Sequence, residues 1–495
     1  MNCFSQKQPQ SFQEVIGRNS MYLLMNTIGS GVLNFICAVL LARYLGVENY
    51  GVIIFANYLM LFMFGIFGND LSGVKLISQN MNNQNQLGII LKGVFIYHVI
   101  FALSCAFLLL LFSIVSDRFI PLNISIHMRS ISIIVVVNIF IGMFGSFWDG
   151  FQRMNWIVLT DVVPKSLKLL GFAILVWYGL GLGQILWSWG GIYFIYTITV
   201  LPLLFRLFIK GKAVFLGVPF TTFPHKTYLV YGMFLKIPGL TRSFVPFIIS
   251  FYLGYIMVDS SKIGLYGAAN GIAAIMFILV GPISRALFPS LSQLYSQNKM
   301  DLLMEISIKT YRYFGLLIFV GVAVLIFWRQ NIVQWVYGSE FQGASQIFGY
   351  LCIAIFFECL KHITYVLLNA TNHASVLSIV EGIGIMFILT MGVILIRQFG
   401  VFGAAVTVTI SAVFTSILGL MLVQRLIRIK MNQWIINALV ALFTFLLVIH
   451  LPVNVYSLIF LIVTLFLFIR DVKVAEVSHL FALLVGKSGR FNRFS

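Results

Sequence analysis

Long apolar runs separated by short polar segments dominate the chain. A run of about twenty apolar residues can cross a bilayer as an α-helix, and Gly, Asn, Pro and clusters of charge mark the ends of such runs. This pattern predicts an all-α integral membrane protein with about fourteen transmembrane helices. The predicted helices cover residues 19–44, 50–76, 87–115, 128–149, 154–179, 184–209, 228–256, 264–292, 304–328, 342–368, 375–396, 401–424, 432–450 and 453–470.

The composition indicates that lipid is the solvent for most of the chain. Hydrophobic residues make up 60% of the 495 residues and charged residues 9%, with a mean hydropathy of +1.00, whereas soluble proteins carry roughly 25% charged residues. The apolar run after the polar segment 1–18 is too long for a signal peptide, so we expect it to remain as the first helix. Five cysteines lack CxxC or Cys/His spacing, so we expect no disulfide framework, metal site or other cofactor. Glycine-rich phosphate loops and hydrolase motifs are absent, which argues against an enzyme.

The net charge of +18 would indicate a nucleic-acid partner in a soluble protein, but part of it here reflects topology. Lys and Arg accumulate in the cytoplasmic loops of membrane proteins. With the N-terminus inside, nineteen basic residues fall in predicted cytoplasmic segments and six in predicted external loops. We therefore expect both termini to be cytoplasmic and no nucleic acid as a partner.

Short motifs in the first half recur in the second, at an offset of roughly 210 to 220 residues. Tyr44-Leu45-Gly46 resembles Tyr252-Leu253-Gly254, and Ser78-Gln79-Asn80 resembles Ser296-Gln297-Asn298. Because six helices return the chain to its starting side, two such halves form a parallel repeat about an axis along the membrane normal. The predicted units are an N-terminal segment 1–18, a six-helix bundle 19–209, a linker 210–227, a second six-helix bundle 228–424, a helix pair 425–470 and a basic tail 471–495.

Ten charged residues lie inside predicted helices. The basic ones are Lys92, Lys165, Lys168, Lys236, Arg242, Arg285 and Lys361, and the acidic ones are Asp161, Glu358 and Glu381. Each charge at the centre of a membrane helix costs about 2.5–3.5 kcal/mol, so these side chains are expected to face protein or water. Three anions cannot neutralise seven cations, and the excess positive charge indicates an anionic ligand.

The arrangement of these cations favours a diphosphate. Asp161, Lys165 and Lys168 share one helix face. Together with Lys236, Arg242 and Arg285, these lysines rise from the cytoplasmic side towards the midplane. Lys binds phosphate as a point charge and Arg as a bidentate fork. Candidate substrate-binding residues are therefore Lys165, Lys168, Lys236, Arg242, Arg285 and Lys361, and candidate sites for a coupling proton or sodium ion are Asp161, Glu358 and Glu381.

Structural roles stay open for several of these residues. The pairs Asp161–Lys165 and Glu358–Lys361 could be ion pairs that only lock helices together. Lys92 and Arg285 could extend to the cytoplasmic surface. Trp187 and Trp189 could stack on sugar rings or belong to the apolar bulk of the helices.

Motifs after the first helix and at both ends of the eighth resemble those of a known family. Leu40-Leu41-Ala42-Arg43-Tyr44-Leu45-Gly46, Gly264-Leu265-Tyr266-Gly267-Ala268-Ala269-Asn270 and Arg285-Ala286-Leu287-Phe288-Pro289-Ser290-Leu291-Ser292 resemble the polysaccharide exporters of the multidrug/oligosaccharidyl-lipid/polysaccharide superfamily. The likeness covers roughly residues 16 to 430. Within the superfamily it is greatest for O-antigen flippases of the Wzx type.

The resemblance implies a protein of the bacterial cell inner membrane that moves an undecaprenyl-diphosphate-linked oligosaccharide to the periplasmic leaflet by alternating access. It also implies ion antiport, contact with membrane lipids, and a polysaccharide polymerase and a chain-length regulator as partners. Lipid II flippases typically carry an arginine inside the first helix, whereas this chain has no Lys or Arg between Arg18 and Arg43, which argues against lipid II as the substrate. The last two helices could form a groove for the lipid tail or be purely structural.

Two other functions compete with this interpretation. A cation-coupled multidrug exporter of the same fold would be expected to have an acidic or neutral lumen, and the cationic excess argues against it. A membrane-embedded polysaccharide polymerase or ligase usually carries a large external loop, whereas no loop predicted here exceeds about twenty residues.

Overall fold

The computed structural model describes residues 12–68, 70–81, 83–151, 156–208, 223–428 and 432–450, and all regular secondary structure in these ranges is helical. The predicted fourteenth helix, the tail 471–495 and most of the linker 210–227 lie outside the described residues. The first group of helices comprises α1 (Phe12–Phe67), α2 (Asp70–Gln79), α3 (Gln84–Val115), α4 (Leu122–Ser125), α5 (Met128–Gly150), α6 (Ile157–Trp177) and α7 (Leu182–Phe208). The second comprises α9 (His225–Met257), α10 (Ser260–Ala273), α11 (Val280–Ser296), α12 (Met300–Phe327), α13 (Arg329–Tyr337), α14 (Ala344–Ala370), α15 (Ala374–Ile427) and α16 (Asn432–His450).

Two long helices are each divided by a glycine. The backbone leaves helical geometry at Gly46 (φ 72°, ψ 176°) in α1 and at Gly400 (φ 59°, ψ −133°) in α15. A positive φ is readily adopted only by glycine, so each glycine turns the chain sharply while helical pairing resumes on both sides. The predicted boundaries near residues 44 and 400 coincide with these two turns.

Other predicted helices are interrupted in different ways. The predicted helix 50–76 is broken before α2, and the predicted helix 264–292 contains a 3-10 stretch at Ala274–Leu279 between α10 and α11. The predicted loop after residue 328 contains α13, whose nine residues are too few to cross a bilayer.

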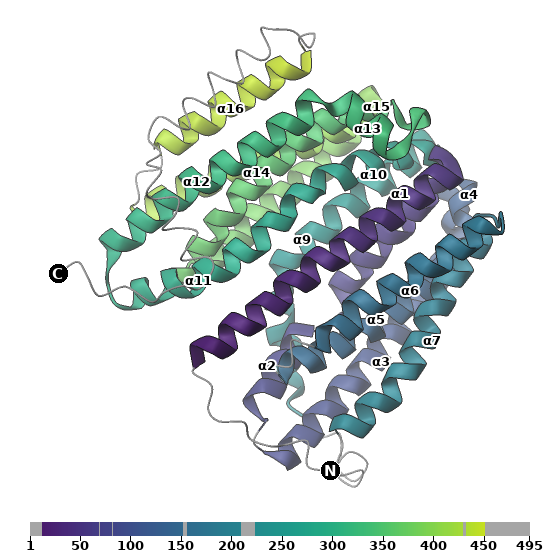
Figure 1. Ribbon diagram of the computed structural model, residues 1–495, viewed down its shortest axis with the longest axis horizontal. Coiled ribbons are helices and arrows are strands. Elements are labelled where there is room, and N and C mark those ends of the chain that lie inside the picture. The colour runs from purple at the N-terminus through teal and green to yellow at the C-terminus, as the bar shows by residue number, and fades with distance from the viewer. Residues whose placement is uncertain are drawn as a thin grey trace.

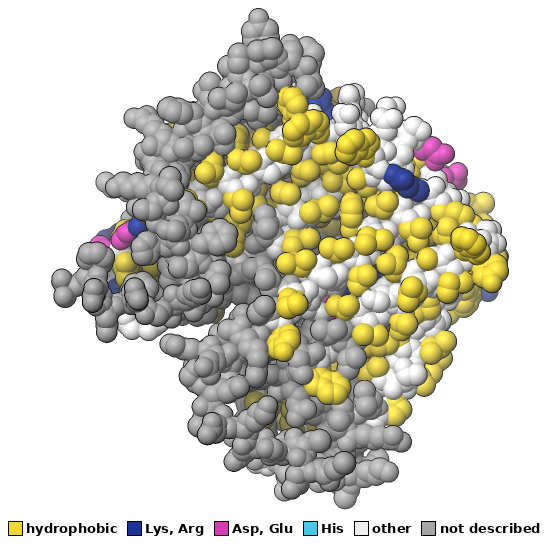
Figure 2. Space-filling view, in the orientation of Figure 1, with side chains coloured by type: hydrophobic (Ala, Val, Ile, Leu, Met, Phe, Trp, Pro, Cys, Tyr) yellow, Lys and Arg dark blue, Asp and Glu magenta, His cyan; other side chains and the backbone are white. Residues whose placement is uncertain are grey.

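Eight helices of the described residues are long and apolar enough to cross a membrane. Their surroundings differ, because 83% of the most apolar part of α14 is buried inside the protein but only 22% of that of α3. The side chains of Leu103, Phe107 and Ile114 on α3 are exposed, and Figure 2 shows hydrophobic side chains spread over the visible face of the described helices. An apolar exterior of this kind is stable in lipid and not in water, so the chain is a multi-pass membrane protein.

Each group of helices packs around one central helix. In the first group α5 contacts α2, α3, α6 and α7, and in the second α14 contacts α10, α11, α12 and α15. At the boundary between the two groups, α1 of the first group contacts α9 and α10 of the second (Figure 1). The two groups therefore meet along α1.

Candidate functional site

The first cluster of charged residues lies on α6, on the side that faces α1. Lys165 forms an ion pair with Asp161 one helical turn away, and the side-chain amide of Asn26 on α1 donates a hydrogen bond of 2.7 Å to the second carboxylate oxygen of Asp161. Asp161 is thus compensated by a cation on its own helix and by an amide from α1.

Lys168 occupies a different environment, two turns along α6 from Asp161. Its side chain is buried, with 8% of its surface exposed. The ammonium donates a hydrogen bond of 3.3 Å to the amide oxygen of Asn34 on α1 and lies 4.8 Å from the ring centroid of Trp189 on α7. Both contacts are with neutral groups, and the cation–π contact is favourable for a desolvated ammonium. This junction of α1, α6 and α7 therefore holds a positive charge whose neighbours, among the described residues, are not carboxylates.

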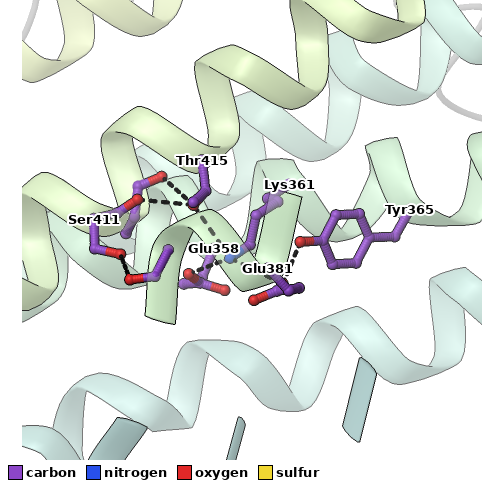
Figure 3. Close-up of polar contacts among 8 residues, drawn as sticks. Glu358, Lys361, Tyr365, Glu381, Ser411 and Thr415 are labelled. Atoms are coloured by element: carbon purple, nitrogen blue, oxygen red, sulfur yellow. Dashed lines mark hydrogen bonds and ion pairs between the residues drawn. The ribbon is translucent and has the colours of Figure 1, made fainter. Parts of the chain in front are cut away.

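The second cluster joins α14 to the two helical segments of α15 that lie before and after Gly400 (Figure 3). The Lys361 ammonium lies 2.6 Å from a carboxylate oxygen of Glu358 and 3.3 Å from one of Glu381. The Tyr365 hydroxyl donates to Glu381, and Lys361 also donates a 3.4 Å hydrogen bond to the Thr415 hydroxyl. Lys361 is 4% exposed and Glu381 9%. Buried charges require partners, and here every charged group has at least one.

The two clusters differ in the sign of their net charge when all groups are ionised. Asp161, Lys165 and Lys168 sum to one positive charge, whereas Glu358, Lys361 and Glu381 sum to one negative charge. The first cluster can therefore attract an anion, and the second can accept a proton or another cation.

Several contact residues were not singled out in the sequence. The contact residues Asn26 and Asn34, with Ser30 between them, recur every four residues in the apolar first part of α1, and this spacing places all three along one side of the helix. That polar stripe could have been recognised. Tyr365 and Thr415 gave no such signal, because their importance depends on the packing of α14 against α15.

The remaining predicted residues are placed less completely. Lys236 and Arg242 lie in α9 and Arg285 in α11, but their side chains are outside the described residues. Lys92 is half-buried on α3. Trp187 is 55% exposed and Trp189 is 2% exposed, so these two neighbours on α7 point into different environments.

Solved structures define the class of fold. The chain is similar to a lipid II flippase, MurJ, in an inward closed conformation, with a TM-score of 0.65 and 15% identity over 93% of this chain and 98% of that one. It is also similar to an inward-facing multidrug resistance transporter of the MATE family, with a TM-score of 0.63 and 12% identity over 84% of this chain and 98% of that one. The chain therefore shares its fold with these two membrane transporters.

Sequence comparison identifies the family. The model of the polysaccharide biosynthesis protein family matches residues 16–295, which is more than half of the chain, and the protein belongs to that family. A protein of Shigella flexneri named as an O-antigen transporter is 22% identical over 79% of this chain and 94% of its own length. A flippase of low-salt glycan biosynthesis in Haloferax volcanii is 25% identical over 35% of this chain and 37% of its own. The resemblance to polysaccharide exporters inferred from the motifs is confirmed.

Proposed function

We propose that the protein is a flippase that moves an undecaprenyl-diphosphate-linked oligosaccharide of surface-polysaccharide synthesis across the bacterial inner membrane. The family match and the relatives named as an O-antigen transporter and as flippases support transport of a glycan. The buried Lys168, with its neutral neighbours, is the observation that supports an anionic headgroup. A diphosphate would supply the counter-charge that Asn34 and Trp189 do not.

Alternating access by two rocking halves is part of this proposal. Positive φ angles occur at Gly46 and Val258 and again at Gly179 and Gly400. The first pair is 212 positions apart and the second 221, close to the offset of the sequence motifs. The central helices α5 and α14 also contact corresponding neighbours in their groups. These correspondences support a parallel repeat, with the substrate taken up between the halves. The proposal includes the fourteen crossings and the two cytoplasmic termini expected from the sequence.

The second cluster is proposed to bind the coupling ion. Glu358 and Glu381 share one ammonium, so one negative charge is left for a proton or a sodium ion. Since three helical segments contribute to this cluster, a change in its charge can alter how α14 and α15 pack. Asp161 is the corresponding candidate in the first half.

A cation-coupled multidrug exporter is the second candidate, because the negative charge of the second cluster would suit a cationic substrate. Lys168 argues against it, since a buried ammonium repels a cationic drug. A polymerase or ligase is less well supported, because the curated relatives are named as transporters and flippases.

The test replaces Lys168 by Ala or by Arg and measures surface polysaccharide in a strain that lacks its flippase. We expect Lys168→Ala to lose most of the polysaccharide and Lys168→Arg to retain it, since Arg keeps the charge. The matched control is Lys262→Ala, which removes an exposed ion pair of 3.8 Å with Asp259. Full polysaccharide in Lys168→Ala at wild-type protein level would contradict the proposal, and resistance to cationic drugs conferred by the wild-type chain would favour the exporter.

A further inference from the structure

One end of the molecule contains a seam at which the two helix groups touch through their backbones. We define the seam as the contacts that residues 43–58 of α1 and residue 123 of α4 make with α10 and α13, at the end where Figure 1 shows α4 and α13. A Cβ atom on Gly264 would lie 2.2 Å from the carbonyl oxygen of Val47, and one on Gly51 would lie 1.9 Å from that of Ser260. Only glycine permits so close an approach.

Polar side chains cross the seam next to this glycine contact. The Asn123 amide donates a 2.5 Å hydrogen bond to the hydroxyl of Ser260, and the Asn270 amide donates one of 2.9 Å to the hydroxyl of Tyr58. The rings of Tyr50, Tyr337 and Phe341 pack against one another in the same region, with centroids 5.3–6.0 Å apart. The seam is therefore closed by packing and by hydrogen bonds together.

Arg43 adds a charged contact at the edge of the seam. Its Nε donates a 2.9 Å hydrogen bond to the carbonyl of Val336, and its Nη2 donates to the carbonyl of Trp335. Both carbonyls belong to the last turn of α13, which ends before Gly338 (φ 96°). Carbonyls at a helix C-terminus lack intrahelical partners and carry the negative end of the helix dipole. A guanidinium fork from α1 thus caps a helix of the other group.

We propose that Arg43 is a latch that holds this end of the protein closed, and that the latch must release α13 before the two halves can separate here. Arg43 is exposed, so water can replace the carbonyls as its partners and the contact can open at small cost. The glycine contact is buried, so water cannot replace its partners in the same way. The role of the latch in transport rests on the proposed rocking of the halves, whereas the closure itself can be measured without any substrate.

The experiment measures how fast a thiol inside the seam becomes accessible. Ile54 is 8% exposed and its side chain lies against Gly267 of α10, so Ile54→Cys provides the reporter. The full chain in lipid nanodiscs is exposed to a polar maleimide, and labelling of each cysteine is followed by mass spectrometry. The native Cys105 and Cys352 are fully buried within single helix groups and report unfolding.

In Arg43→Ala we expect Ile54→Cys to be labelled about fivefold faster, because the two exposed hydrogen bonds of Arg43 to α13 are together worth about one of ordinary net strength. Arg43→Lys should be intermediate, because it keeps the charge without the fork. The control Arg397→Ala removes an exposed arginine near the Gly400 turn. In this control, Ile54→Cys should be labelled at the original rate. Equal rates in Arg43→Ala and Arg397→Ala would overturn the latch. If Cys352 also becomes reactive in Arg43→Ala, that variant has unfolded, and Arg43→Lys is used for the test instead. The proposal is then overturned if Ile54→Cys is labelled at the same rate with Arg43→Lys as with the native Arg43.

Discussion

Lys361 is the residue on which the second cluster depends, because it is the cation placed between Glu358 and Glu381. Its replacement by Met would leave two carboxylates close together and partly buried. We expect Lys361→Met to lower the free energy of unfolding by about 3–5 kcal/mol, the usual cost of breaking a buried ion pair. The thermal unfolding midpoint of the purified protein measures this loss.

The double variant Lys361→Met, Glu381→Gln distinguishes charge from packing. If electrostatic repulsion causes the loss, removing one carboxylate should recover part of the midpoint. If the double variant is less stable than Lys361→Met, lost packing explains the effect instead. Lys262→Met, at an exposed ion pair, should change the midpoint little.

The ion pairs within single helices could be predicted from residue spacing. Asp161–Lys165 and Glu358–Lys361 are four and three positions apart, so helical geometry alone brings them together. Glu381 could not be assigned to Lys361 in this way, because it lies on α15 and reaches α14 only through tertiary packing. For the same reason, Asn34 and Trp189 could not be predicted as neighbours of Lys168, since they belong to α1 and α7.

At the level of helices, the length of the apolar runs predicts where most helices lie. The interruptions within the helices depend on local backbone geometry. The runs were long enough to predict the helices without any knowledge of packing. The turns at Gly46 and Gly400 coincide with predicted boundaries because glycine marks them in the sequence. The 3-10 stretch at Ala274–Leu279 contains no glycine or proline, but Pro282 follows it and lacks the N–H that would bond the carbonyl of residue 278.

The glycine contact between α1 and α10 makes a prediction about helix packing. Gly264→Ala would place a Cβ atom 2.2 Å from a backbone oxygen of Val47, which cannot move away as a side chain can. We expect a loss near the upper end of the range for overpacking, about 3 kcal/mol, seen as a lower thermal midpoint. Gly145→Ala is the matched control, because nothing lies within 4 Å of its Cβ position and alanine favours the helix. A Gly264→Ala midpoint as high as that of Gly145→Ala would mean that the helices can separate without penalty.

The last described helix, α16, is predicted to be structural. Phe445 stacks on Phe319 with ring centroids 5.1 Å apart and meets Phe356 edge-on at 5.4 Å, and His450 is hydrogen-bonded to the Tyr350 hydroxyl at 2.8 Å. Phe445→Ala should therefore destabilise the protein by roughly 3 kcal/mol, the lower end for a buried phenylalanine, because lipid weakens the drive to bury apolar surface between helices.

Phe443, two positions away on the same helix, provides the control for this substitution. It is 62% exposed, whereas Phe445 is fully buried. Phe443→Ala should leave the thermal midpoint unchanged. If α16 only lies loosely against α12 and α14, both substitutions will have equally small effects.

At the level of the whole molecule, the two clusters lie in different helix groups and carry opposite net charges. The cluster on α6 faces α1, and the cluster on α14 faces α15. If the first binds the headgroup and the second binds the coupling ion, substitutions in the two groups must alter different parameters of transport. The sequence predicted an overall cationic excess but not this division, because the division depends on which acids meet which cations in the folded protein.

Transport by the purified protein in proteoliposomes can separate the two parameters. Lys168→Ala should raise the concentration of lipid-linked oligosaccharide needed for half-maximal flipping by about tenfold, the effect of losing one charge-assisted contact with phosphate, while the response to a proton or sodium gradient is kept. Glu381→Gln should leave that concentration unchanged and abolish the difference between rates measured with and without the gradient, because the second cluster then has no net charge to be neutralised by an ion. If both substitutions raise the half-maximal concentration and both retain the gradient response, the two groups share one site and the division of roles is wrong.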